Sequence, residues 1–194
     1  MTTPANALPN ARVPLLGFAA ASGTGKTTLL KQLIPLLKQQ GLRVGLIKRS
    51  HHDFEIDHPG KDSYELRQAG ASPVMLSAAG RRALITEHPE DRERTLNEEL
   101  AYFDQSGVDL ILVEGFKHEP FPKIELCRVE RGKPVLYRDD PWVIAIAIDQ
   151  PLSETLPIPQ LNLNDPDTLC HFITDFHRQL TANLYVPSAP SSQR

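Results

Sequence analysis

Cysteine is scarce in this sequence: Cys127 and Cys170 are the two cysteines among 194 residues, and they do not form a CxxC pair. This count and spacing exclude a disulfide framework and a structural zinc site built from paired cysteines. The same cysteine usage agrees with a reducing compartment, and we expect the protein to act in the cytoplasm.

Long apolar runs and a strong excess of charge are also missing. No stretch reaches the ~20 apolar residues that a membrane helix needs. The first residues lack the basic and then apolar pattern of a secretory signal, so we expect none. The formal net charge is −3, which implies no general attraction to nucleic acid or to an anionic membrane. We therefore expect neither as a partner.

A glycine-rich segment, residues 20–28, stands between an apolar run and a helical pattern. Ala20 occupies the place of the usual first glycine, whereas Gly23 and Gly25 let the backbone curl with its N–H groups turned inward. These donors and the positive end of the following helix form the phosphate cradle of P-loop proteins. The residues predicted to bind a nucleoside triphosphate are Ser22, Gly23, Thr24, Gly25, Lys26, Thr27 and Thr28.

Within this loop, Lys26 is predicted to act in catalysis by reaching the β- and γ-phosphate oxygens, and Thr27 to place its hydroxyl on Mg²⁺. The alternative is a glycine-rich turn that binds nothing. We favour the phosphate loop because a strand and a helix flank it where the mechanism requires them.

Alternating strand and helix patterns predict an α/β protein with the three-layer P-loop NTPase fold, in which helices flank a mainly parallel sheet. We expect a single nucleotide-binding domain over 13–182, with disordered tails at 1–12 and 186–194. Polar and apolar residues alternate over 123–129 and are followed by Arg131-Gly132. This pattern predicts that 116–140 leaves the main sheet as a β-hairpin. Residues 73–86 contain a second pair of candidate short strands.

Three acidic residues lie at the ends of predicted strands or in the loop that follows a strand, and they are candidates for the nucleotide site. Glu114 ends an apolar strand, so we expect it to hold Mg²⁺ and to act in catalysis; an ordinary polar strand end is the alternative. Asp53 is a candidate for the same two roles, with a solvated loop as its alternative. Asp149 is a candidate contact to the nucleotide base. Metal binding by the neighbouring His51 and His52 is disfavoured, because adjacent side chains on a strand point apart.

Together, the segments 22–28, 47–53, 59–64 and 112–117 resemble the molybdopterin-guanine dinucleotide biosynthesis protein B (MobB) family. The resemblance runs from about residue 14 to residue 176. It implies GTP binding with Mg²⁺, weak GTP hydrolysis, a homodimer and a β-ribbon beside the nucleotide core. It also implies an adapter role beside the guanylyltransferase that joins GMP to molybdopterin, with molybdopterin itself as a candidate ligand.

Two other functions share this fold. A small-molecule kinase would transfer phosphate to an added acceptor, and a metal-delivering GTPase would retain nickel or zinc. The sequence identifies no arginine finger, so we expect hydrolysis to be slow, on the order of 10⁻⁴ to 10⁻² per second.

Overall fold

The computed structural model describes residues 7–50, 54–90, 92–132 and 134–184. These residues form two compact units. One comprises the chain up to Arg49 together with the chain from Thr95 onward, and the other comprises the residues between Ser50 and Arg94. The sequence predicted a single domain over 13–182. That domain assignment stays a prediction. The two strands of the second unit pair with each other and not with the main sheet.

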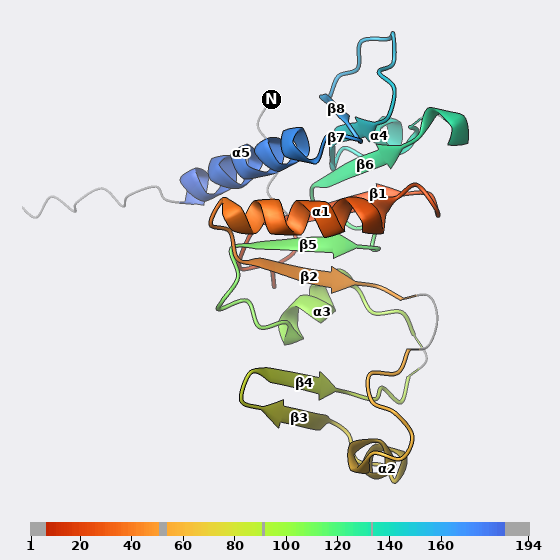
Figure 1. The fold of residues 1–194 in the computed structure, drawn as a ribbon, viewed down its shortest axis with the longest axis vertical. Coiled ribbons are helices and arrows are strands. Elements are labelled where there is room, and N and C mark those ends of the chain that lie inside the picture. Colours follow the sequence, from red (N-terminus) through yellow and green to blue (C-terminus); the bar gives the residue numbers. More distant parts are fainter. Residues whose placement is uncertain (1–6, 51–53, 91, 133, 185–194) are drawn as a thin grey trace, which may run out of the picture. The chain divides into compact units, whose positions relative to one another are not determined.

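The first unit contains a six-stranded sheet in the order β2-β5-β1-β6-β7-β8. Every neighbouring pair is parallel, so the strands end at the same edge of the sheet. Figure 1 shows β1, β2, β5 and β6 running in one direction. The strands are β1 (Leu15–Ala20), β2 (Val44–Lys48), β5 (Leu110–Glu114), β6 (Lys123–Cys127), β7 (Val143–Ile148) and β8 (Gln160–Asn162).

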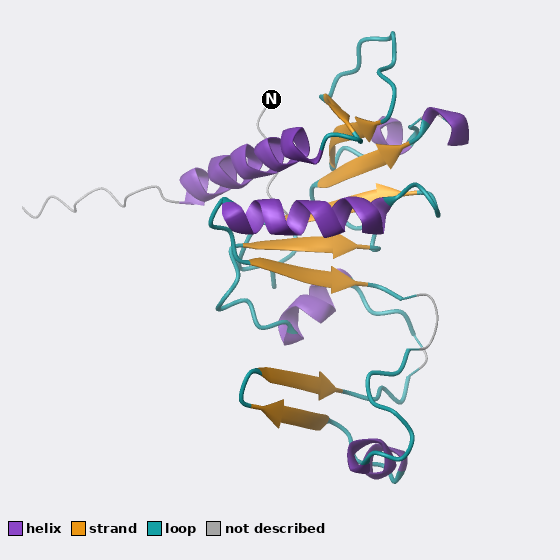
Figure 2. Ribbon diagram, in the orientation of Figure 1, coloured by secondary structure: helices purple, strands orange, loops and turns teal. Residues whose placement is uncertain are grey.

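Helices pack on both faces of this sheet, as predicted. One face is covered by α1 (Lys26–Gln39) and α5 (Pro166–Leu184), whose Leu33 and Ile173 belong to the same buried apolar cluster as Leu112 of β5. The other is covered by α3 (Leu96–Tyr102), whose leucines pack against the opposite side of β1 and β5. Figure 2 distinguishes these helices from the strands. Because β1 and β5 are buried on both faces, their sequences are nearly continuous apolar runs.

The predicted hairpin over 116–140 is wrong. Its first half is β6, a strand buried along its whole length between β1 and β7. Its second half contains a short 3-10 turn (Val129–Arg131) and the helix α4 (Leu136–Asp139). The antiparallel hairpin of the structure is instead β3 (Val74–Ala78) with β4 (Arg81–Ile85), in the second unit beside α2 (Asp62–Gln68).

The alternating charges of β6 were misleading because they are buried and paired. Lys123 is 1% exposed; its Nζ donates to the carbonyl of Phe121 at 3.0 Å and lies 3.1 Å from the Asp140 carboxylate. Burial lowers the pKa of Lys123, and Asp140 raises it in part. Glu125 accepts backbone N–H groups at the start of α4. A buried strand whose charged side chains are paired can thus have the alternating sequence pattern of a half-exposed strand.

The expected disorder of 1–12 is also wrong for residues 7–12, whereas 1–6 and 186–194 lie outside the described residues. Leu8 is buried against the α3 face of the sheet. The backbone N–H of Asn10 donates to Asn97, and that of Arg12 donates to Gln105. An apolar anchor and satisfied backbone groups therefore order this segment. None of the helices within the described residues is long and apolar enough to cross a membrane.

Candidate functional site

The phosphate loop links β1 to α1 and has the conformation that its glycines allow. Gly23 and Gly25 have φ angles of 75° and 98°, which disfavour residues with a Cβ. Thr24 is buried, and its hydroxyl donates to the carbonyl of Ala21 at 2.8 Å, which closes the turn. Gly25 caps α1 without a side-chain hydrogen bond. The first N–H groups of the helix are thus left for a ligand.

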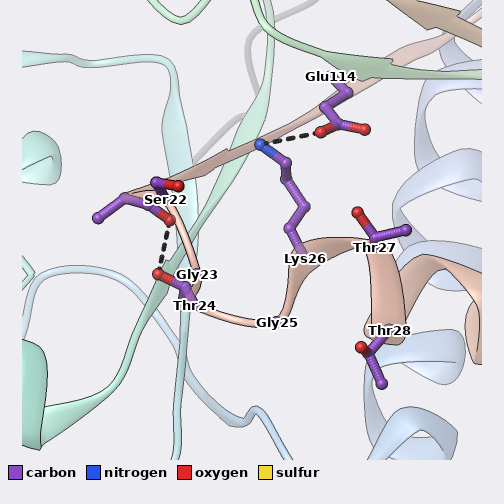
Figure 3. A pocket seen from close by; sticks show the side chains of 9 residues that line it. Ser22, Gly23, Thr24, Gly25, Lys26, Thr27, Thr28 and Glu114 are labelled. Atoms are coloured by element: carbon purple, nitrogen blue, oxygen red, sulfur yellow. Dashed lines mark hydrogen bonds and ion pairs between the residues drawn. The ribbon is translucent and has the colours of Figure 1, made fainter.

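A pocket of about 320 Å³ lies over this loop, and residues 21–28 line it together with Glu114. Pockets of this size suit small ligands. Figure 3 shows Lys26 extending from the start of α1 toward Glu114. The structure therefore brings together all seven predicted phosphate-loop residues and the predicted acid from β5.

Glu114 lies between two lysines. Its Oε1 is 3.3 Å from Nζ of Lys26, and its Oε2 is 3.4 Å from Nζ of Lys48 on the neighbouring strand β2. After Glu114 the chain turns at Gly115, where a Cβ would stand 2.8 Å from Cβ of Arg49. The turn therefore needs glycine. The arrangement places a carboxylate, the Lys26 ammonium and a helix N-terminus around one cavity, which suits a phosphate with a divalent cation.

The other predicted residues lie elsewhere. Asp53, His51 and His52 lie outside the described residues. Asp149 follows β7 but is not among the described residues that line the pocket. Its carboxylate accepts the backbone N–H of Val129 at 3.0 Å and lies 3.5 Å from Arg128. A contact of Asp149 with the base stays a prediction. Within the described part of the chain, no group of three His, Cys, Asp or Glu side chains could hold a metal.

Two arginines that the sequence analysis missed contact the loop. Arg128 donates from Nε to the carbonyl of Thr24 at 3.0 Å, and Arg131 from Nη1 to that of Ser22 at 3.5 Å. Both follow β6, the strand mistaken for a hairpin. Recognising 123–127 as a parallel strand beside β1 would have placed its end at this edge.

Known proteins share both the sequence pattern and the fold of this chain. Residues 15–149 match the family model described as "Molybdopterin guanine dinucleotide synthesis protein B". The chain belongs to this MobB family. It is 50% identical over 165 residues to the Escherichia coli (strain K12) "Molybdopterin-guanine dinucleotide biosynthesis adapter protein", covering 84% of this chain and 93% of that one. A Haemophilus influenzae protein of the same name is 47% identical over 74% of this chain and 79% of its own.

Solved structures of the MobB family share the fold. The crystal structure of a MobB homologue from Bacillus stearothermophilus superposes with a TM-score of 0.64 and 26% identity, over 84% of this chain and 97% of that one. The three-layer P-loop NTPase fold predicted from the sequence is therefore confirmed, with the hairpin in a different place.

Proposed function

We propose that this chain binds GTP with Mg²⁺ at the phosphate loop, hydrolyses it slowly and serves as an adapter in forming the molybdopterin-guanine dinucleotide. The observation that carries the proposal is the pocket over residues 21–28, where Lys26 and Glu114 face one another. The adapter role is supported by the names of the E. coli and H. influenzae relatives. Those names contain a guanine dinucleotide, which favours GTP over ATP.

In this proposal each residue has a defined task. Lys26 exchanges its ion pair with Glu114 for the β- and γ-phosphate oxygens, and the loop N–H groups bind the remaining oxygens. Thr27 and Glu114 hold Mg²⁺, and Asp53 is a third candidate ligand. When bound, Mg²⁺ neutralises charge that develops on the phosphates. Glu114 keeps Lys48 as a partner after Lys26 leaves, so the carboxylate is not left unpaired.

The expected partners belong to the same proposal. They are a second copy of the chain, the guanylyltransferase that uses GMP and, as a candidate ligand, molybdopterin. The cytoplasm is the proposed place of action. Co-sedimentation with the purified guanylyltransferase, in the presence and absence of GTP, would test the partnership; no complex under either condition would contradict it.

Calorimetric titration with GTP and ATP in the presence of Mg²⁺ tests the nucleotide site. We expect GTP to bind more tightly than ATP, and Lys26→Ala to weaken GTP about 100-fold or more because a cation that touches two phosphates is lost. Lys31→Ala removes an exposed lysine from the same helix and should bind GTP like the wild type. Undiminished binding by Lys26→Ala, or preference for ATP, would contradict the proposal.

Phosphate release separates the adapter from the kinase. The wild type should release inorganic phosphate from GTP slowly without an added acceptor, and Glu114→Gln should reduce this rate more than it reduces GTP affinity. Steady phosphate transfer to an added pterin, or an unchanged rate in Glu114→Gln, would count against the assigned mechanism.

A further inference from the structure

Arg128 joins the phosphate loop to the ends of two other strands. It is the first residue after β6, which pairs with β1. Its Nε donates to the Thr24 carbonyl at 3.0 Å, and its Nη1 lies 3.5 Å from the Asp149 carboxylate and 3.4 Å from Oδ1 of Asn164. Arg128 therefore contacts three polar groups from three separate segments of the chain. The side chain is 30% exposed, and both its Nε and its Nη1 have protein partners.

The carbonyl that Arg128 binds belongs to the same peptide group as the N–H of Gly25. In a trans peptide the C=O and the N–H point to opposite sides. A guanidinium on the Thr24 oxygen therefore turns the Gly25 N–H away from Arg128. Among the described residues, no protein acceptor is found for this N–H, and Gly25 lines the pocket. A positive charge on the carbonyl also polarises the peptide and strengthens its N–H as a donor.

Arg131 makes a similar but longer contact at the other loop glycine. It donates to the Ser22 carbonyl at 3.5 Å, and that peptide group carries the N–H of Gly23. A Cβ built on Gly23 would stand 3.0 Å from Nη1 of Arg131, so the Arg131 side chain lies close to the loop backbone. The arginines therefore bind the two peptide groups whose N–H groups belong to the two positive-φ glycines of the phosphate loop.

Asp149 in turn fixes the start of the Arg128 segment. One carboxylate oxygen accepts the N–H of Val129, and the other faces the guanidinium of Arg128. Both carboxylate oxygens of Asp149 therefore have partners within the protein.

We propose that Arg128 is a positioning residue that orients the Thr24–Gly25 peptide so that the Gly25 N–H binds phosphate, and that Asp149 holds Arg128 in place. This inference rests on the proposed function, because it concerns the same pocket. It assigns Asp149 to the phosphate loop and not to the base.

Inorganic tripolyphosphate tests the inference, because it has phosphates but no base or ribose. We expect Arg128→Ala to weaken both tripolyphosphate and GTP by about tenfold, since a charge-assisted hydrogen bond that orders the loop is lost. Arg178→Ala removes an exposed arginine of α5 and should leave both affinities unchanged. Loss with GTP alone, or with neither ligand, would overturn the inference.

The amide signals of the glycines provide a readout that a merely structural role would not move. On tripolyphosphate addition to the wild type, we expect the N–H signals of Gly23 and Gly25 to shift downfield in NMR spectra. In Arg128→Ala the Gly25 shift should be lost and the Gly23 shift retained. A Gly25 shift of full size in a folded Arg128→Ala variant would overturn the inference. Should that variant not fold, Asp149→Asn provides the same test, with a reduced Gly25 shift expected and a full shift overturning the inference.

Asp149→Asn also separates the two roles of the acid. As a support for Arg128, Asp149 should affect GTP and xanthosine triphosphate equally, with both bound about threefold more weakly. Improved binding of xanthosine triphosphate at the expense of GTP would overturn its positioning role and assign it to the base. A wild type that binds neither tripolyphosphate nor GTP would contradict the proposed function itself, and the inference with it.

Discussion

The two compact units differ in what lies at their centres. In the unit with the six-stranded sheet, aliphatic side chains such as Leu33 and Leu112 are fully buried. Between residues 54 and 90, the described residues include no buried hydrophobic side chain; Asp57 is buried there, whereas Phe54, Leu66 and Met75 are exposed. One unit is therefore built around apolar packing and the other around charge.

Arg67 is the centre of the second unit. Its guanidinium binds Asp57 at 2.9 Å and also pairs with Glu55 and Glu87. The hydrogen bond to Asp57, followed by that to Glu87, raises the pKa of Arg67 above its usual value. A buried carboxylate such as Asp57 is tolerated only because this cation accompanies it. The two units should therefore respond to different substitutions.

The largest effect is expected from a cavity in the first unit. Leu33→Ala removes a fully buried side chain between α1 and the sheet. We expect the free energy of unfolding to fall by about 2–5 kcal/mol, measured by urea denaturation. The exposed Lys31→Ala on the same helix should change it by less than about 0.5 kcal/mol. Equal losses of unfolding free energy in the two variants would show that apolar packing does not hold the first unit together.

Arg67→Ala should act on the second unit alone. It leaves Asp57 buried without its cation, so we expect amide hydrogen exchange in β3 and β4 to accelerate by about tenfold or more, while β1 and β5 stay protected. Arg81→Ala changes an exposed arginine of β4 and is the matched control. Unchanged protection of β3 and β4 in Arg67→Ala would show that the ion cluster does not hold this unit together.

Glu125→Gln tests whether the first unit also depends on a buried charge. The Glu125 carboxylate accepts three N–H groups at the start of α4, from Val135, Leu136 and Tyr137, at 2.9–3.0 Å. An amide has one acceptor oxygen in place of two, so we expect a loss of about 1–2 kcal/mol in urea denaturation. A loss of unfolding free energy as large as that of Leu33→Ala would show that the first unit depends on buried charge as much as on apolar packing.

The smallest effect concerns an ion pair at the start of β5. The hydrogen bonds from Arg43 lower the pKa of Asp109 to about 2. Because the folded-state pKa is depressed, the stabilisation is full above the unfolded-state pKa of about 4 and is lost as the pH falls to about 2. With solvent screening, Asp109→Asn should cost about 1 kcal/mol at pH 7. Thermal melts should show the difference from the wild type shrinking toward pH 2, and a constant difference would contradict the assignment.

The phosphate loop and Glu114 could be predicted because their signals are local. Gly23 and Gly25 stand between a strand and a helix pattern, and Glu114 directly follows a continuous apolar run. The helical pattern in the sequence extends over 91–103, whereas α3 begins at Leu96, because Thr95 and Glu98 form a capping box there. Such a boundary depends on one cap and is easily misplaced.

The environment of β6 could not be predicted from local patterns. Lys123 depends on Asp140, and Glu125 depends on the N–H groups of α4, so their burial is compensated by residues 10 or more positions away. Mistaking β6 for an exposed strand also hid Arg128, whose contact with Thr24 spans 104 positions. Asp53 stays a prediction. For Asp149, the predicted contact with the base and the inferred support of Arg128 are alternatives, which the Asp149→Asn variant separates.

A crystal structure with a non-hydrolysable GTP analogue and Mg²⁺ tests the central claim most directly. The account predicts that the β- and γ-phosphate oxygens lie within hydrogen-bond distance of the N–H groups of Gly23, Gly25 and Lys26. It also predicts that Nζ of Lys26 has moved from Glu114 to the phosphates. An analogue bound elsewhere, with Lys26 still paired to Glu114, would contradict it.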